Sequence, residues 1–81
     1  MNLYLISQNR NRGYDTYDSA VVAALSEAEA REIHPGAWQD DAWGRSNSTW
    51  ANSPEDVVVQ QIGAALPGIQ AGQIVASFNA G

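Results

Sequence analysis

At the start of the chain, over residues 2–8, Leu3, Leu5 and Ser7 alternate with Tyr4, Ile6 and Gln8. In an extended chain, odd positions from Leu3 point to one side and even positions from Tyr4 point to the other. Since this stretch is also rich in strand-forming residues, it predicts a first strand. A second apolar run over residues 19–25 predicts another buried strand. A turn at residues 9–13 would join the two strands, because its glycine and asparagines tolerate positive φ.

A helix signal follows the second apolar run. Ser26 and Glu29 have the spacing of a capping box, in which the serine side chain accepts a hydrogen bond from the third amide of the helix. The pattern predicts a helix over residues 27–34, with Ala30 and Ile33 facing the core and the following proline ending it. A helix of this length is marginal alone, so we expect it to pack on the sheet.

Two further apolar runs complete the predicted sheet. Residues 57–62 predict a third strand, residues 63–68 a turn, and residues 72–78 a fourth strand. The order of elements predicts an α+β fold, a small antiparallel sheet of about four strands with one short helix on one face (β-β-α-loop-β-β). We expect a single domain over residues 1–81. The helix covers one face only, so the long loop or a second copy of the chain would have to cover the other.

The long loop, residues 35–56, contains all three tryptophans of the chain, Trp38, Trp43 and Trp50. It follows neither the helical nor the strand period and exceeds an ordinary connection, which is typical of functional or self-packed loops. Indole combines an apolar body with one polar N–H and is costly to leave in water. Two explanations stay open: the tryptophans seal the uncovered sheet face, or they form a binding surface. We expect Trp43 to be the exposed one.

Composition narrows the class of protein. The 81 residues include no cysteine, and the net charge is −5, with nine carboxylates against four cations. This charge argues against direct binding to nucleic acid, so we expect none. We find neither a run long enough to span a membrane nor a signal-peptide pattern, and we expect no membrane association. The absence of cysteine is compatible with the cytoplasm, which is the location we expect.

No residue pattern indicates an active site. His34 is the only histidine, and no spacing of histidine with carboxylates resembles a ligand set, so we expect neither a metal nor a cofactor. The carboxylate pairs Asp15/Asp18 and Asp40/Asp41 would need a cleft to work as acid and base, and a domain of this size has little room for one. We therefore expect no catalytic residues and a non-enzymatic protein.

Arginine and aromatic residues form the candidate binding surface. Every cation of the chain is arginine, whose planar guanidinium pairs with carboxylate or phosphate and stacks on aromatic rings. Such a set suits a protein surface, or a nucleotide-like ligand held by stacking and phosphate pairing. The candidates come from the hairpin and from the long loop: Arg10, Arg12, Tyr14, Tyr17, Trp38, Trp43, Arg45 and Trp50.

Residues 14–24 (YDTYDSAVVAA) and the closing residues 76–81 (ASFNAG) resemble a family of small uncharacterised proteins from bacteriophages and prophages. Residues 2–8, 29–35 and 54–57 look like the same family. The resemblance brings no catalytic residue with it, and it implies a phage protein acting in the host cell. Small acidic phage proteins are often inhibitors or sponges of host defence. This function is suggested by the phage context and not by particular residues.

Three functions stay open at this point. The leading hypothesis is a non-enzymatic phage accessory protein that binds a host protein or complex and inhibits a component of host defence, in the manner of an anti-CRISPR. The second is a sponge that sequesters a nucleotide-like signal. The third is a structural homo-oligomer without a small ligand, in which the long loop is the interface.

Overall fold

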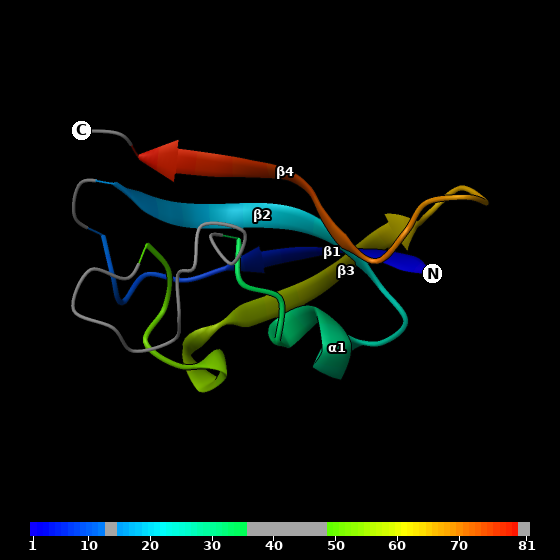
Figure 1. Ribbon diagram of the computed structural model, residues 1–81. Helices are drawn as coiled ribbons and strands as arrows, with labels where there is room; N and C mark the ends of the chain where they lie inside the picture. Colours follow the sequence, from blue (N-terminus) through cyan, green and yellow to red (C-terminus); the bar gives the residue numbers. More distant parts are fainter. Residues whose placement is uncertain (13–14, 36–48, 80–81) are drawn as a thin grey trace.

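The protein folds as an antiparallel four-stranded sheet with one short helix on one face, which confirms the expected α+β class (Figure 1). The computed structural model describes residues 1–12, 15–35 and 49–79. The strands follow the order β3-β1-β2-β4 across the sheet. The elements are β1 (Asn2–Ser7), β2 (Thr16–Ala24), α1 (Glu27–Arg31), the short 3-10 helix η2 (Pro54–Asp56), β3 (Val58–Ala64) and β4 (Gly72–Asn79).

The central hairpin is regular, whereas both outer strands are interrupted. β1 and β2 pair continuously, from Asn2 opposite Ala24 to Ser7 opposite Ser19. The register shifts once between β1 and β3 and twice between β2 and β4. The extra residue is Ile62 in β3 at the first shift, and Asp18 in β2 and Ile74 in β4 at the other two. Such bulges bend an edge strand and increase its twist.

The connection between β3 and β4 crosses one end of the sheet from edge to edge (Figure 1). It turns at Pro67 and Gly68, where the Ile69 amide donates to the Leu66 carbonyl at 3.2 Å. Gly68 has a φ of 92°, a value that a side chain disfavours and that the third position of this turn requires. The predicted turn over residues 63–68 therefore begins later, because β3 continues through Ala64.

The helix begins where the capping pattern predicts and ends early. The Ser26 Oγ accepts a hydrogen bond from the Glu29 amide at 3.2 Å. The helix ends at Arg31 rather than at residue 34, and the Glu32 amide donates to the Glu29 carbonyl in a tighter turn. The residue before Pro35 disfavours the helical conformation, so the chain leaves the helix before it.

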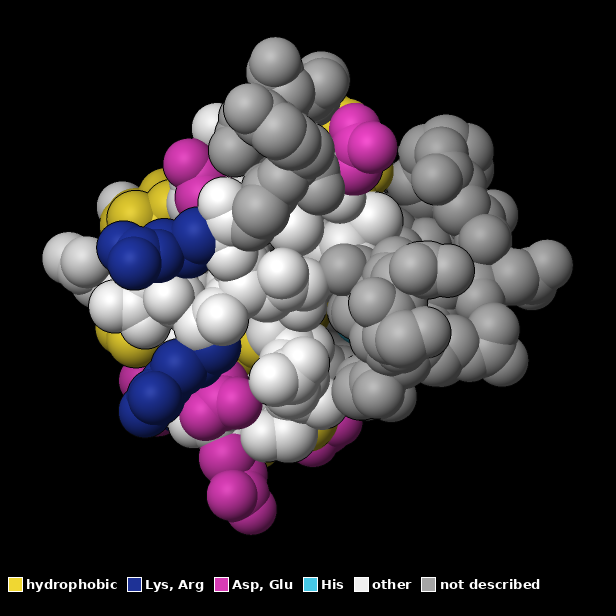
Figure 2. Space-filling view, turned by 90° about the vertical axis from the view of Figure 1, so that its left-hand side faces the viewer, with side chains coloured by type: hydrophobic (Ala, Val, Ile, Leu, Met, Phe, Trp, Pro, Cys, Tyr) yellow, Lys and Arg dark blue, Asp and Glu magenta, His cyan; other side chains and the backbone are white. Residues whose placement is uncertain are grey.

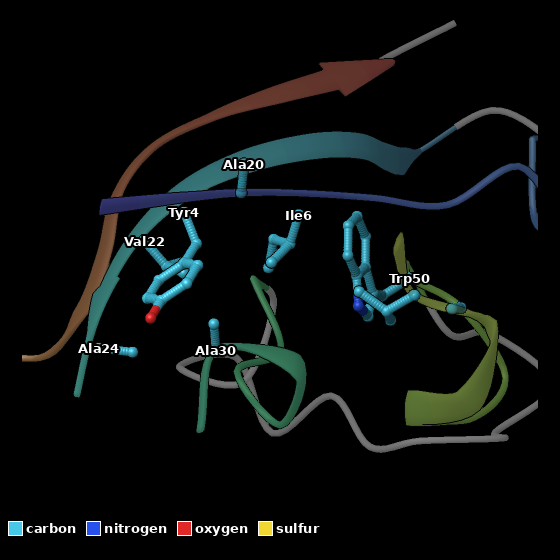
Figure 3. Packing of buried hydrophobic residues seen from close by; sticks show 9 residues of the cluster. Tyr4, Ile6, Ala20, Val22, Ala24, Ala30 and Trp50 are labelled. Carbon is cyan, nitrogen blue, oxygen red and sulfur yellow. The ribbon is translucent and has the colours of Figure 1, made fainter. Parts of the chain in front are cut away.

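The hydrophobic core lies between one face of the sheet and α1. We call this side the covered face. Figure 3 shows Tyr4, Ile6 and Val22 pointing away from the sheet toward α1, with Ala30 facing them from the helix. The Trp50 indole packs beside Ile6 and is fully buried (0 % exposed). Burying one large apolar side chain stabilises a fold by about 1.5–3 kcal/mol.

The opposite face of the sheet, the open face, is not covered by any described residue outside the strands. The long loop or a second copy of the chain was expected to cover this face. The described end of the loop packs on the covered face, where Trp50 and Ala51 join the core, and residues 36–48 of the loop lie outside the described residues. The loop leads into β3, which contacts α1, and the Arg31 guanidinium donates to the carbonyl of Val57 immediately before β3. The open face consists of three rows across the strands: Gly63, Leu3, Ala23 and Gly72, then Gln60, Leu5, Val21 and Val75, then Val58, Ser7, Ser19 and Ser77.

Candidate functional site

The candidate site lies where the β1–β2 hairpin turns, at the end of the sheet away from the β3–β4 connection. We call it the hairpin end: residues 8–12, the start of β2 (16–18) and the last part of β4 (77–78). Its turn is held from within by Gln8, which is 7 % exposed. The Gln8 side-chain oxygen accepts from the amides of Arg10 and Asn11, at 3.0 and 2.8 Å. Its nitrogen donates to the carbonyls of Asn11 and Tyr17, at 2.7 and 2.8 Å.

The end of the long loop is tied to the same turn. The Asn11 Nδ2 donates to the Trp50 carbonyl at 2.9 Å, and the Tyr17 amide donates to the Thr49 carbonyl at 2.7 Å. The Arg10 Nε lies 3.9 Å from the Asp56 Oδ1. Since the Trp50 ring is locked in the core, these bonds fix the turn relative to the core.

An aromatic pair and a shallow depression complete the hairpin end. The rings of Tyr17 and Phe78 lie 4.7 Å apart between centroids and are tilted by 56°, a favourable arrangement for two aromatic rings. A depression of about 370 Å³ opens next to Phe78. Both charge signs line it, together with two hydroxyls; the lining residues are Arg12, Thr16, Asp18, Ser77 and Phe78.

Figure 2 looks at the molecule from this end. Two dark blue groups of arginine side chains lie near each other on the left of the view. The upper one adjoins yellow hydrophobic side chains, and the lower one adjoins magenta carboxylates. One arginine group is therefore presented beside apolar surface and the other beside carboxylates. Arg10 has 69 % of its side chain exposed, so its guanidinium is accessible to a partner despite the contact with Asp56.

The structure brings part of the predicted binding set together. Arg10, Arg12 and Tyr17 all lie at the hairpin end. Trp50 contributes only its backbone carbonyl to this end, because its ring is buried in the core. The other predicted residues, Tyr14, Trp38, Trp43 and Arg45, lie outside the described residues.

The predicted binding set omits several residues of this site, among them Gln8, Asn11 and Phe78. Gln8 was placed as the polar end of the first strand, and no local pattern marks a buried amide that bonds to four backbone groups. Asn11 was read as a turn residue, although its side chain also reaches a carbonyl 39 positions away. Phe78 was placed on the fourth strand. The pairing of Phe78 with Tyr17 follows from the β2–β4 register, which no local pattern encodes.

The described ranges contain no group of three or more histidine, cysteine, aspartate or glutamate residues able to hold a metal ion. No helix within them has the length and apolar character needed to cross a membrane. Comparison of the chain with known protein families, curated proteins and solved structures finds no match. The function of this site is therefore argued from the geometry of its described residues.

Proposed function

We propose that this chain is a non-enzymatic binding protein that attaches to another protein through its hairpin end. The observation that carries the proposal is the placement of Arg12 beside Phe78, whose ring pairs with Tyr17, together with the exposed Arg10 side chain on the same turn. Arginine and tyrosine dominate the residues that contribute most to protein interfaces, because they combine apolar area with directed hydrogen bonds.

Preorganisation of the turn supports this role. A binding loop loses conformational entropy when it is ordered by its partner, and a loop that is already ordered loses less. Gln8 and Asn11 already fix the backbone that presents both arginines. The arginine guanidinium groups would donate hydrogen bonds to carboxylates on the partner, and the aromatic pair would pack against an apolar side chain next to those carboxylates. Following the phage resemblance, we propose a host-defence protein as that partner.

The proposal is tested by mixing the purified chain with purified host-defence complexes and following co-elution by gel filtration. We expect a stable complex with one of them. Arg12→Ala should weaken the affinity at least about tenfold, because it removes a charge-assisted contact. Leu25→Ala is the matched control, since Leu25 is 65 % exposed and lies outside the hairpin end. Absence of a complex across the panel, or equal loss in both variants, would contradict the proposal.

A nucleotide-like signal is the second candidate ligand, favoured by the depression beside Phe78. Its Arg12 guanidinium and its hydroxyls suit a phosphate, and Phe78 offers a ring for stacking. The Asp18 carboxylate lines the same depression and would repel a phosphate, which is why we rank this function second. A panel of mononucleotides and cyclic dinucleotides should raise the melting temperature if the depression binds one of them. An unchanged melting temperature across the panel would exclude this function.

A further inference from the structure

Two neighbouring rows of the open face are mainly apolar, the third combines Val58 with three serines, and none of the three rows contains a charged residue. Within the four strands, all of which are described, Asp18 is the one charged residue, and it lies at the hairpin end. Leu5 and Val21 are half-buried at the centre of the face, whereas Val75 beside them is 58 % exposed. A hollow of about 200 Å³ lies among these aliphatic side chains and the serines of the next row.

The distribution of charge makes the open face the surface best suited to a second copy. Two chains that each carry −5 repel one another wherever their carboxylates approach. Carboxylates gather on the other side of the molecule, in and next to α1 and η2: Glu27, Glu29, Glu32, Glu55 and Asp56. Face-to-face contact through the open faces would place both sets on the outside, where their repulsion is weakest.

The two edges of the sheet are less suited than the open face to binding a second copy. Edge strands can pair with another chain through their free backbone groups, and bulges oppose such pairing because they break the continuity of the edge. Both edges of this sheet are interrupted in this way, by Ile62 in β3 and by Ile74 in β4. The open face is therefore the larger continuous surface available to a partner.

The size of the face predicts how tightly two copies would hold together. Four strands about 4.8 Å apart, each contributing about six residues of about 3.3 Å, make a face of roughly 400 Å². A stable interface of standard size buries about 800 Å² on each partner. The area available here is about half of that, so it supports a weak dimer that dissociates on dilution.

We propose that the open face binds a second copy of this chain, face to face, to form a weak symmetric dimer. The two sheets would pack about 10 Å apart with their strands at about −30°. The hollow beside Leu5 and Val21 would receive an aliphatic side chain of the second copy. This surface adjoins the hairpin end at Ser77, which lines both the depression and this hollow, but its centre at Leu5 and Val21 lies outside that end, so the dimer does not rest on the proposed binding function.

Sedimentation velocity of the full chain between about 10 µM and about 1 mM tests the proposal, a range that covers weak association. The weight-average mass should rise from 8.7 kDa toward twice that value. Gln60→Lys and Val75→Lys place a charge on the open face and should keep the mass at 8.7 kDa throughout. Each of these changes takes the net charge from −5 to −4, which by itself weakens the repulsion between two copies and favours association. A lost dimer would therefore be due to the new charge on the open face.

Gln61→Lys is the matched control. It makes the same substitution one position along the same strand, at an exposed site whose cross-strand partner is Tyr4 of the covered face. We expect this variant to associate like the unmodified chain. A constant mass of 8.7 kDa for the unmodified chain would overturn the proposal. Equal loss of association in Gln60→Lys and Gln61→Lys would also overturn it, since that result would place the contact at the β3 edge.

Discussion

The two faces of the sheet are built from the same strands and differ in what lies against them. On the covered face, Ile6 and Val22 are fully buried under α1 and Trp50. On the open face, their neighbours Leu5 and Val21 are half-buried. Both faces have aliphatic residues at their centre, so hydrophobic pattern by itself does not decide which face becomes the core. The packing of α1 and Trp50 decides it.

The largest expected effect comes from breaking the cover of the covered face. Trp50→Ala removes a fully buried indole beside Ile6 and leaves a cavity. We expect the free energy of unfolding to fall by about 3–5 kcal/mol, which is a large part of the stability of a small domain. Urea denaturation followed by circular dichroism measures it. A loss below about 1 kcal/mol would mean that Trp50 is not part of the core.

A pair of lysine substitutions on adjacent residues of β4 compares the two faces directly. Ala76→Lys puts a charge against the core and should cost about 2 kcal/mol or more. Val75→Lys lies on the open face and should change the stability of the monomer by less than about 0.5 kcal/mol. Thermal and urea denaturation at a concentration where the chain is monomeric measures both. Similar losses for the two variants would show that the faces are not distinct.

The hairpin end depends on one buried amide. Gln8→Ala leaves the amides of Arg10 and Asn11 without their side-chain acceptor. We expect a loss of about 1–2 kcal/mol, less than for Trp50, because water reaches part of the turn. Hydrogen exchange at the Arg10 and Asn11 amides should become faster, while exchange in the central strands stays slow. Unchanged exchange at both amides would exclude Gln8 as the residue that holds the turn.

The smallest expected effect concerns the ion pair between Arg10 and Asp56. The Arg10 side chain is largely exposed and the contact is long, at 3.9 Å. A double-mutant cycle with Arg10→Ala and Asp56→Ala should give a coupling energy below about 0.5 kcal/mol. A coupling above about 1 kcal/mol would make this pair a structural tie between the turn and η2.

Local signals in the sequence predicted the elements, and contacts between distant residues decided their arrangement. The strand-forming run from Leu3 to Ile6 and the spacing of Ser26 and Glu29 each indicate one element, and both elements form. The sheet order could not be predicted in the same way, because the pairing of β3 with β1 joins segments on either side of the long loop.

The face of the sheet on which Trp50 packs could not be predicted from the local sequence pattern either. An indole in a polar segment indicates burial or binding, and it does not indicate which face of a sheet it will join. That choice is accompanied by hydrogen bonds from Asn11 and Tyr17 to the carbonyls of residues 49 and 50, all of them between distant positions. Gln8 was hidden for the same reason, since its role arises only when the turn has closed.

The most direct test of the difference between the two faces is a methyl NMR dilution series of the full chain. The methyl signals of Leu5, Val21 and Val75 on the open face should shift as the concentration rises. The signals of Ile6, Val22 and Val57 in the core should stay in place. Shifts confined to the core methyls, or no shift at any methyl, would contradict the claim that one face is the core and the other binds a second copy.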